Sequence, residues 1–247
     1  MTRTDGRACD EIRPVSFERG YTRYAEGSVL STFGNTKVLC TATVEDRVPP
    51  FLKGTGSGWV TAEYAMLPRA TSTRTARSTR QGGQDGRSME IQRLVGRVLR
   101  SCVVLDALGE RTITLDCDVI QADGGTRTAA VSGSFVALVD ALRTMRDRGI
   151  FPHLPIRFLV SAVSVGKVQG IAMVDLCYEE DSIAEVDMNL VMNHNGDYIE
   201  VQGTGEKNIF TPVDLQVLLA LGLSGTVAIT ALQREALGFV KGELPDL

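Results

Sequence analysis

A glycine pair followed by a short threonine and arginine run is the stretch whose residue types suggest chemistry most directly. The segment DGGTRT at 123–128 lies between an alternating, strand-like segment and a helical one. The first N–H groups of a helix have no partner within it and carry partial positive charge, so they attract anions. Arg127 adds a planar set of donors that matches phosphate oxygens. The stretch predicts a phosphate-binding turn, and an ordinary turn with a capping threonine and a solvated arginine remains the alternative.

A second arginine stands beside a second predicted helix. Apolar residues recur at helical spacing from Ser88 to Val104, and Arg87 comes just before this segment. Arg87 would then flank one helix N-terminus as Arg127 flanks another. Two arginines at two helix N-termini favour a phosphate site, provided that the fold brings them together.

Two carboxylates flank a predicted turn in the acidic stretch YEEDSIAEVD at 178–187. If the turn brings Asp181 and Asp187 together, their oxygens form a site of the kind that holds Mg²⁺ or Mn²⁺ through one or two carboxylates, water and phosphate. An acidic, exposed turn without a ligand remains the alternative.

An arginine-rich loop is predicted at 68–86. It has no apolar periodicity and is too long for a simple connection, which is typical of a functional loop. Eight arginines, two acidic residues and no lysine fall between Arg69 and Arg100, in a chain whose net charge is −4. Such a basic segment on an acidic protein favours contact with a polyanion such as RNA over a merely solvated loop. The arginines of the loop that would make this contact are Arg69, Arg74, Arg77 and Arg80.

Composition excludes several other classes of protein. The net charge of −4 excludes a uniformly basic nucleic-acid binder. The only histidines, His153 and His194, fall in predicted loops, which argues against a hydrolase that depends on paired imidazoles. Five scattered cysteines without a CxxC pair indicate reduced thiols in a cytoplasmic protein. No apolar run approaches the roughly 20 residues of a membrane span, so no membrane association is expected.

Hydrophobic periodicity predicts the elements that must position these residues. A hairpin is predicted around Gly34-Asn35, and a helix with Thr211 as its N-cap. Two short apolar helices are predicted at 215–223 and 227–237. Many strands with helices in groups favour one compact α+β domain over residues 1–247. The predicted strands are 28–33, 37–44, 59–66, 112–120, 158–165, 170–178 and 197–202.

Taken together, several motifs resemble the ribonuclease PH family of phosphate-dependent 3′→5′ exoribonucleases, also called tRNA nucleotidyltransferases. The resemblance covers nearly the whole chain. The sequence departs from the family at Ser88-Met89, where Thr-Gln is usual, and at Pro212, where an arginine is expected. The motifs that carry the resemblance are DGR…DEIRP, GSVLSTFGNTKVLCTATVED, GWVTAEYAMLP, GRSMEIQRLVGRVLR, LDCDVIQADGGTRTAA, VDLCYEEDSIAEVDMN and EVQGTGE.

The resemblance implies a fold and a set of site residues. The fold would be the α+β type of ribosomal protein S5 domain 2, with a βαβ core, mixed sheets and flanking helices. Asp181 and Asp187 would be the catalytic, metal-binding pair, and the loop arginines would hold the body of tRNA. The subunits would form a homohexamer, a trimer of dimers. The residues that would bind phosphate are Arg87, Gly125, Thr126 and Arg127.

The activity implied is phosphorolysis. Inorganic phosphate would attack the last phosphodiester of tRNA precursors and other structured RNA, release a nucleoside diphosphate and allow the reverse nucleotidyl transfer. Two competing functions remain open. One is a ring subunit that binds RNA without turnover, against which both arginines and both aspartates argue. The other is a small-molecule phosphorylase or kinase, against which the arginine-rich loop argues.

Overall fold

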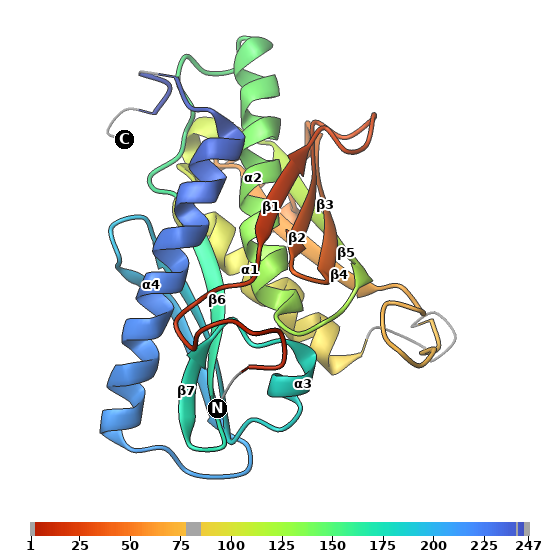
Figure 1. Ribbon diagram of the computed structural model, residues 1–247. Helices are drawn as coiled ribbons and strands as arrows, with labels where there is room; N and C mark the ends of the chain where they lie inside the picture. Colours follow the sequence, from red (N-terminus) through yellow and green to blue (C-terminus); the bar gives the residue numbers. More distant parts are fainter. Residues whose placement is uncertain (1–2, 78–84, 241, 245–247) are drawn as a thin grey trace.

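The computed structural model describes residues 3–77, 85–240 and 242–244, which form alternating layers of sheet and helix (Figure 1). The first layer is a five-stranded sheet with the order β1-β2-β3-β5-β4. Helices α1 and α2 pack on it, and α2 also packs on a four-stranded sheet with the order β7-β6-β8-β9. Helix α4 covers this second sheet, and α3 is a single turn that contacts β6.

Most predicted elements form within a few residues of their expected bounds, whereas β1 and β8 are not among the predicted strands. The strands are β1 Val15–Arg19, β2 Gly27–Phe33, β3 Thr36–Glu45, β4 Trp59–Met66, β5 Thr112–Gln121, β6 Val160–Val168, β7 Ile171–Val174, β8 Val186–Asn193 and β9 Tyr198–Gly205. The helices are α1 Gly86–Cys102, α2 Thr126–Asp147, α3 Tyr178–Asp181 and α4 Pro212–Leu237, with short 3-10 turns at Pro50–Leu52 and Leu105–Leu108.

The unit β4-α1-β5 is the βαβ core that the resemblance implies. Strands β4 and β5 are parallel neighbours, and α1 connects them while burying its apolar face. The other pairs in the first sheet, and all pairs in the second, are antiparallel. The α+β fold is therefore confirmed, with parallel pairing confined to this unit.

Helix α2 is buried on nearly all sides because it lies between the two sheets. Close packing requires glycine at one point of its surface: a Cβ at Gly133 would lie 2.5 Å from Ser31 Cβ and 2.9 Å from Cys40 Sγ. A buried hydrophobic cluster runs continuously through residues of both sheets and this helix. The first turn of α2 is consequently held in a fixed position between the sheets.

The prediction of two short apolar helices is wrong, because 212–237 is one helix. Two glycines at and beside the expected break are packing positions. A Cβ at Gly222 would lie 2.0 Å from Leu190 Cδ1, and one at Gly225 would lie 2.8 Å from Val174 Cγ2. Thr211 caps the helix as predicted, in a reciprocal capping box with Asp214, and Pro212 is its first residue.

Because 215–223 and 227–237 belong to one helix, the prediction that no apolar run is long enough to span a membrane also changes. By length and composition alone, α4 is apolar enough to cross one, with 33% of its most apolar window buried. The expected absence of so long an apolar run is therefore wrong. The inner face of α4 packs on β6 and β7, as a core helix does.

The strand predicted at 170–178 is shorter than expected and ends at Val174. Asp175 follows with a left-handed φ of 52°, which breaks the extended conformation. The chain then turns into α3, so the acidic stretch begins on a helical turn rather than in a loop.

Candidate active site

The DGGTRT segment forms the predicted turn between strand and helix. Strand β5 ends at Gln121, and Gly124 and Gly125 have φ values of 74° and 63°, which residues with a Cβ rarely adopt. A Cβ at Gly124 would also lie 2.5 Å from Leu176 O. The two glycines thus allow the turn to pass directly against the chain that leads to α3.

No threonine caps helix α2. Its N-cap is Gly125, which forms no side-chain cap. The Thr126 hydroxyl accepts a hydrogen bond from Tyr64 at 2.8 Å, and the Thr128 hydroxyl donates to Gly125 O at 2.9 Å. The alternative of a capping threonine is therefore wrong, and the first N–H groups of α2 have no side-chain cap.

The two predicted arginines lie at the first turns of their helices. Arg87 is the second residue of α1, slightly further into the helix than predicted, because Asp85 is the N-cap and accepts from Ser88 N–H at 2.8 Å. The Arg127 side chain is 13% exposed, and its Nη1 donates to Gln202 Oε1 at 2.7 Å. This bond orients the guanidinium of Arg127, while that of Arg87 is exposed.

The two aspartates come from different elements of the second half of the chain. Asp181 ends α3, and Asp187 is the second residue of β8, paired with Gly166 of β6. Asn189 lies two residues further along β8, so its side chain points to the same face as that of Asp187. The turn between 181 and 187 brings the aspartates together, as the sequence suggested.

All six predicted residues border one small cavity of about 220 Å³. The structure thus brings the phosphate-site candidates from the first half of the chain against the carboxylate pair from the second half. Sequence reasoning missed four further residues around it. Asn189 follows from strand alternation after Asp187, and Ser182 is the neighbour of Asp181, whereas Ser164 and Glu206 are brought to the cavity by the fold. The lining residues are Arg87, Gly125, Thr126, Arg127, Ser164, Asp181, Ser182, Asp187, Asn189 and Glu206.

Burial raises the pKa of both aspartates. For Asp187, removal from water and then the negative charge of Asp181 raise the pKa to about 6 from the ordinary 3.8. For Asp181, removal from water is again the largest cause and raises the pKa, opposed by the positive charge of Arg87. The cavity therefore holds two carboxyls that are harder to ionise than ordinary aspartates and that a neighbouring cation would help to ionise.

The donor set fits a hard divalent cation. Asp181 and Asp187 supply carboxylate oxygens, and Asn189 and Glu206 add further oxygens to the same lining. Among the described residues, no cluster of three or more His, Cys, Asp or Glu side chains is poised to hold a metal. Mg²⁺ and Mn²⁺ accept one or two carboxylates beside water and substrate oxygens, so Asp181 and Asp187 would hold such an ion in this way.

The arginine-rich segment lies apart from this cavity. Residues 67–77 are irregular after β4, and Arg69, Arg74 and Arg77 are exposed. Arg80 lies outside the described residues. None of the three described arginines lines the 220 Å³ cavity, and the same is true of both histidines. Thr71, Ser72, Thr73 and Thr75 of the same segment line a separate cavity of about 870 Å³.

Comparison with known proteins agrees with this geometry. The description "3′ exoribonuclease family, domain 1" matches residues 11–143, and "domain 2" of the same family matches residues 159–225. The fold is similar to that of rice (Oryza sativa) Rrp46, with a TM-score of 0.77, 20% identity, and coverage of 95% of this chain and 100% of that one.

Two solved exosome structures are also similar in fold. A chain of the Archaeoglobus fulgidus exosome with RNA bound to the active site gives a TM-score of 0.76 at 21% identity, covering 93% of this chain and 92% of that one. A chain of an archaeal exosome core gives 0.72 at 20% identity, covering 95% and 91%. The family matches confirm the resemblance in the sequence: this chain belongs to the 3′ exoribonuclease family of RNase PH.

Proposed function

We propose that the protein is a phosphorolytic 3′→5′ exoribonuclease that trims the 3′ end of tRNA precursors. One observation carries this proposal. An uncapped helix N-terminus, with Arg127 in its first turn and Arg87 opposite, faces the carboxylates of Asp181 and Asp187 across a cavity of about 220 Å³. A phosphate anion and a phosphodiester can then occupy adjacent positions.

The phosphate dianion is the nucleophile. Its oxygen would form a bond to the phosphorus of the last phosphodiester, while the bond from that phosphorus to the 3′ oxygen of the preceding nucleotide breaks. The leaving 3′ oxygen takes a proton, and the terminal nucleotide departs as a diphosphate. Phosphate is already anionic near neutral pH, so no histidine base is required. The main barrier is repulsion between two anions, which Arg87, Arg127 and the helix N–H groups would reduce.

The carboxylate pair has two candidate roles. Asp181 and Asp187 would hold Mg²⁺ or Mn²⁺, and the ion would offset charge on the diester. In the other role, Asp187 would give its proton to the leaving 3′ oxygen, for which a pKa of about 6 is suitable. If the proton is needed, turnover falls as pH rises above 6; if the ionised pair binds the metal, turnover rises through the same range.

The exposed arginines after β4 would contact the body of the RNA. Within the described ranges, Arg69, Arg74 and Arg77 form no ion pair with a carboxylate, so their charge is available to phosphates of a bound polyanion. A small substrate confined to the cavity would not reach them. This placement supports a large RNA substrate over a small-molecule phosphorylase.

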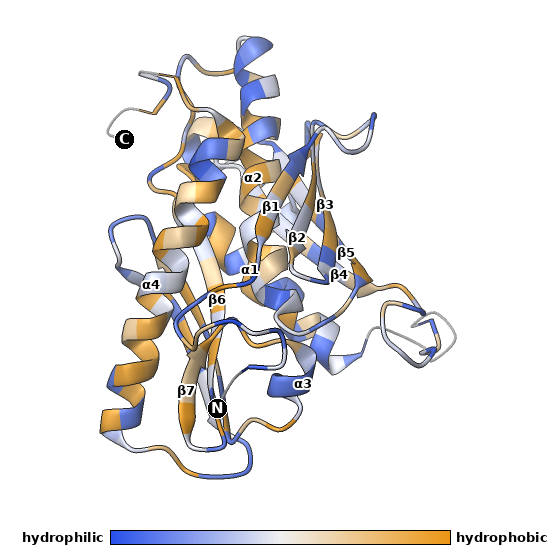
Figure 2. Cartoon of the chain, in the orientation of Figure 1, coloured by the Kyte–Doolittle hydropathy of each residue, from blue (hydrophilic) through white to orange (hydrophobic). Residues whose placement is uncertain are grey.

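The outer face of α4 supports assembly into a homohexamer. Figure 2 shows apolar residues along much of this helix, and its exposed apolar side chains include Val213, Val217, Leu223 and Val227. Apolar patches of this kind mark interaction surfaces. We assign this face to a boundary between subunits of the ring.

The deciding experiment uses a tRNA that carries extra 3′ nucleotides, with Mg²⁺, in the presence and absence of inorganic phosphate. The expected products are nucleoside diphosphates that form only with phosphate. Monophosphates released without phosphate would identify a hydrolase and overturn the proposal. Binding of the tRNA without any release would instead identify an RNA-binding subunit that lacks turnover.

A further inference from the structure

A buried ion pair lies directly behind the phosphate turn. Arg13 Nη2 lies 2.7 Å from Asp175 Oδ1, Arg13 Nε lies 3.0 Å from Asp175 Oδ2, and the backbone N–H of Arg13 donates to Oδ2 at 2.7 Å. The two side chains are 3% and 1% exposed. Arg13 and Asp175 lie 162 residues apart in the chain, so no local sequence pattern pairs them.

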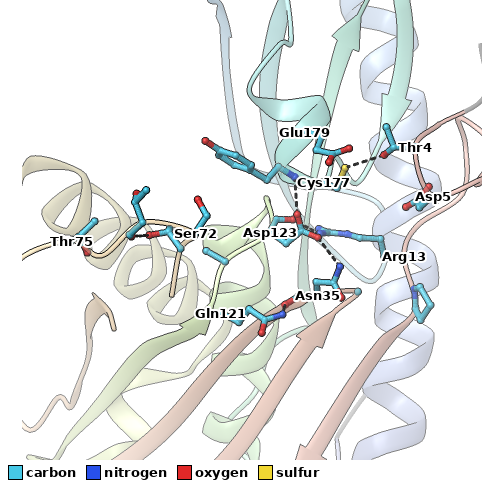
Figure 3. A pocket seen from close by; sticks show the side chains of 16 residues that line it. Thr4, Asp5, Arg13, Asn35, Ser72, Thr75, Gln121, Asp123, Cys177 and Glu179 are labelled. Atoms are coloured by element: carbon cyan, nitrogen blue, oxygen red, sulfur yellow. Dashed lines mark hydrogen bonds between the residues drawn. The ribbon is translucent and has the colours of Figure 1, made fainter. Parts of the chain in front are cut away.

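The same guanidinium also holds the turn. Arg13 Nη1 donates to the carbonyl of Asp123 at 2.5 Å, and Nη2 lies 3.1 Å from the position that a Cβ on Gly125 would take. Figure 3 shows Arg13 beside Asp123 in the wall of a second cavity, of about 870 Å³, that borders the turn. Arg13 therefore touches the turn at residues 123–125 without itself lining the 220 Å³ cavity.

Thr36 provides a second, uncharged contact with this turn. Its hydroxyl donates to Gly124 O at 2.6 Å and accepts from Asp123 N–H at 2.9 Å. The side chain is fully buried. Arg13 and Thr36 thus fix the backbone of Asp123 and Gly124, which precede the N-cap residue of α2.

Asp175 connects the contacts that Arg13 makes with the turn to the segment that carries Asp181. It lies between β7 and α3, and its N–H donates to Ser164 O at 2.6 Å. The next residue, Leu176, donates from its N–H to Ser164 Oγ at 3.2 Å, and Ser164 lines the 220 Å³ cavity. A further link crosses directly, from Tyr178 N–H to Asp123 Oδ1 at 3.2 Å. The chain from Asp175 then reaches Asp181 within α3.

We propose that Arg13 is a positioning residue, which sets the distance between the phosphate turn and the carboxylate pair. This inference rests on the proposed phosphorolysis. Phosphate on the turn and the diester at Asp181 and Asp187 must be aligned for attack, and the turn belongs to one sheet while the aspartates belong to the other half of the fold. Misplacement of reacting groups by about 1 Å can reduce rates on the order of 100-fold. Arg13 joins the two halves where that distance is determined.

The test is the Arg13→Lys variant of the full-length protein, assayed on extended tRNA with Mg²⁺. Lysine keeps the charge beside Asp175 but cannot reach the carboxylate and the Asp123 carbonyl with one planar group. We expect KM for phosphate to rise about tenfold and kcat to fall about tenfold, with unchanged tRNA affinity, as a misplaced turn requires. Thr36→Val, which removes two hydrogen bonds and no charge, should change KM for phosphate in the same direction by about fivefold.

A matched control separates positioning from stability. Arg143 forms a similar two-bond pair with Glu243, at 2.8 and 2.7 Å, and neither residue lines the cavity. Arg143→Lys should lower the melting temperature without changing KM for phosphate. If Arg13→Lys and Thr36→Val behave in the same way as this control, the positioning role is overturned. Should Arg13→Lys fail to fold, Thr36→Val alone decides.

A different set of results would overturn the proposed phosphorolysis rather than the role of Arg13. Inorganic phosphate alone should raise the melting temperature of the wild-type protein by binding to the folded state. Wild-type protein that shows neither this shift nor phosphate-dependent turnover would overturn phosphorolysis itself. A wild type that shows both, beside variants with unchanged kinetics, would overturn only the role of Arg13.

Discussion

At the scale of single residues, the site combines charges that the fold holds in unfavourable positions. Asp187 is kept beside Asp181 and away from water, which raises its pKa. Arg127 is held by Gln202 and lies 3.3 Å from Glu90 Oε1, so its guanidinium is oriented before any ligand arrives. Such preorganisation is typical of sites that stabilise charge during a reaction.

Replacing Arg127 by alanine should abolish the use of phosphate while leaving RNA binding nearly intact. The guanidinium would contact the attacking anion, and loss of one such donor typically costs on the order of 100-fold to 1000-fold in rate. The measurement is turnover against phosphate concentration, with tRNA affinity determined separately. The control is Arg97→Ala, since Arg97 is half exposed, pairs with Glu200 and does not line the cavity. Wild-type phosphate dependence in Arg127→Ala would remove this residue from the site.

Replacing Asp187 by asparagine should abolish turnover and also stabilise the metal-free protein. The pKa of Asp187 is about 6 in the folded protein and 3.8 ordinarily, so the folded state binds its proton more tightly and ionisation destabilises the fold. The penalty is absent below the ordinary pKa and complete above about 6. At roughly 1.4 kcal/mol per pKa unit it is on the order of 2–3 kcal/mol.

Thermal unfolding of Asp187→Asn and of the wild type at about pH 8 and about pH 4 tests this prediction. The variant should be more stable than the wild type only at the higher pH. Asp116→Asn is the control, since burial also raises the pKa of Asp116, on a strand face away from the cavity. That variant should keep full turnover. An equal shift at both pH values, or near-normal turnover in Asp187→Asn, would contradict the prediction.

At the scale of elements, local signals predicted the parts of the site that depend on neighbouring residues. The alternation of apolar residues predicted β5, and the two glycines predicted the turn. Helical periodicity predicted α1 and α2, with Arg87 and Arg127 at their starts. The role of Arg13 was not predictable, because its partner Asp175 is brought to it only by the packing of the second sheet. The break predicted in α4 failed for a related reason. Gly225 packs on Val163 and Val174, and no local signal distinguishes such a contact from a helix end.

The arginine-rich segment after β4 is expected to determine the salt dependence of RNA binding. Arg74 and Arg77 are exposed in an irregular stretch, so each can contact an RNA phosphate and release counterions. Replacing both by alanine should weaken tRNA binding and reduce the slope of log affinity against log salt by about 1 to 2. Arg47→Ala is the control, since Arg47 is exposed but pairs with Glu45. An unchanged slope would mean that the segment is only solvated.

At the scale of the whole molecule, the layers leave the outer face of α4 uncovered within the described chain. The inner face packs on β6 and β7, yet Val217 is 45% exposed and Val227 is 57% exposed. The length and apolar composition of the helix also satisfy the criterion for a membrane span. A subunit boundary and a lipid surface are therefore the two environments that could cover this face, and they predict different behaviour in solution.

Placing charge on this face should dissociate the proposed ring without unfolding the subunit. In an isolated subunit, Val217→Glu and Val227→Glu are surface substitutions, which usually change stability by less than about 0.5 kcal/mol. At a subunit boundary the same carboxylates lose their water, which is far more costly. The expected result is a fall from hexameric mass to a smaller species in sedimentation, with unchanged circular dichroism.

Tyr24→Glu, at a side chain 91% exposed on a different segment, should leave the mass unchanged. If the double variant keeps the mass of the wild type, and the wild-type protein binds lipid vesicles, the face would be assigned to a membrane. If the mass falls and phosphorolysis falls with it, the site requires a neighbouring subunit, whereas full turnover in the dissociated species would show that one chain carries the complete site.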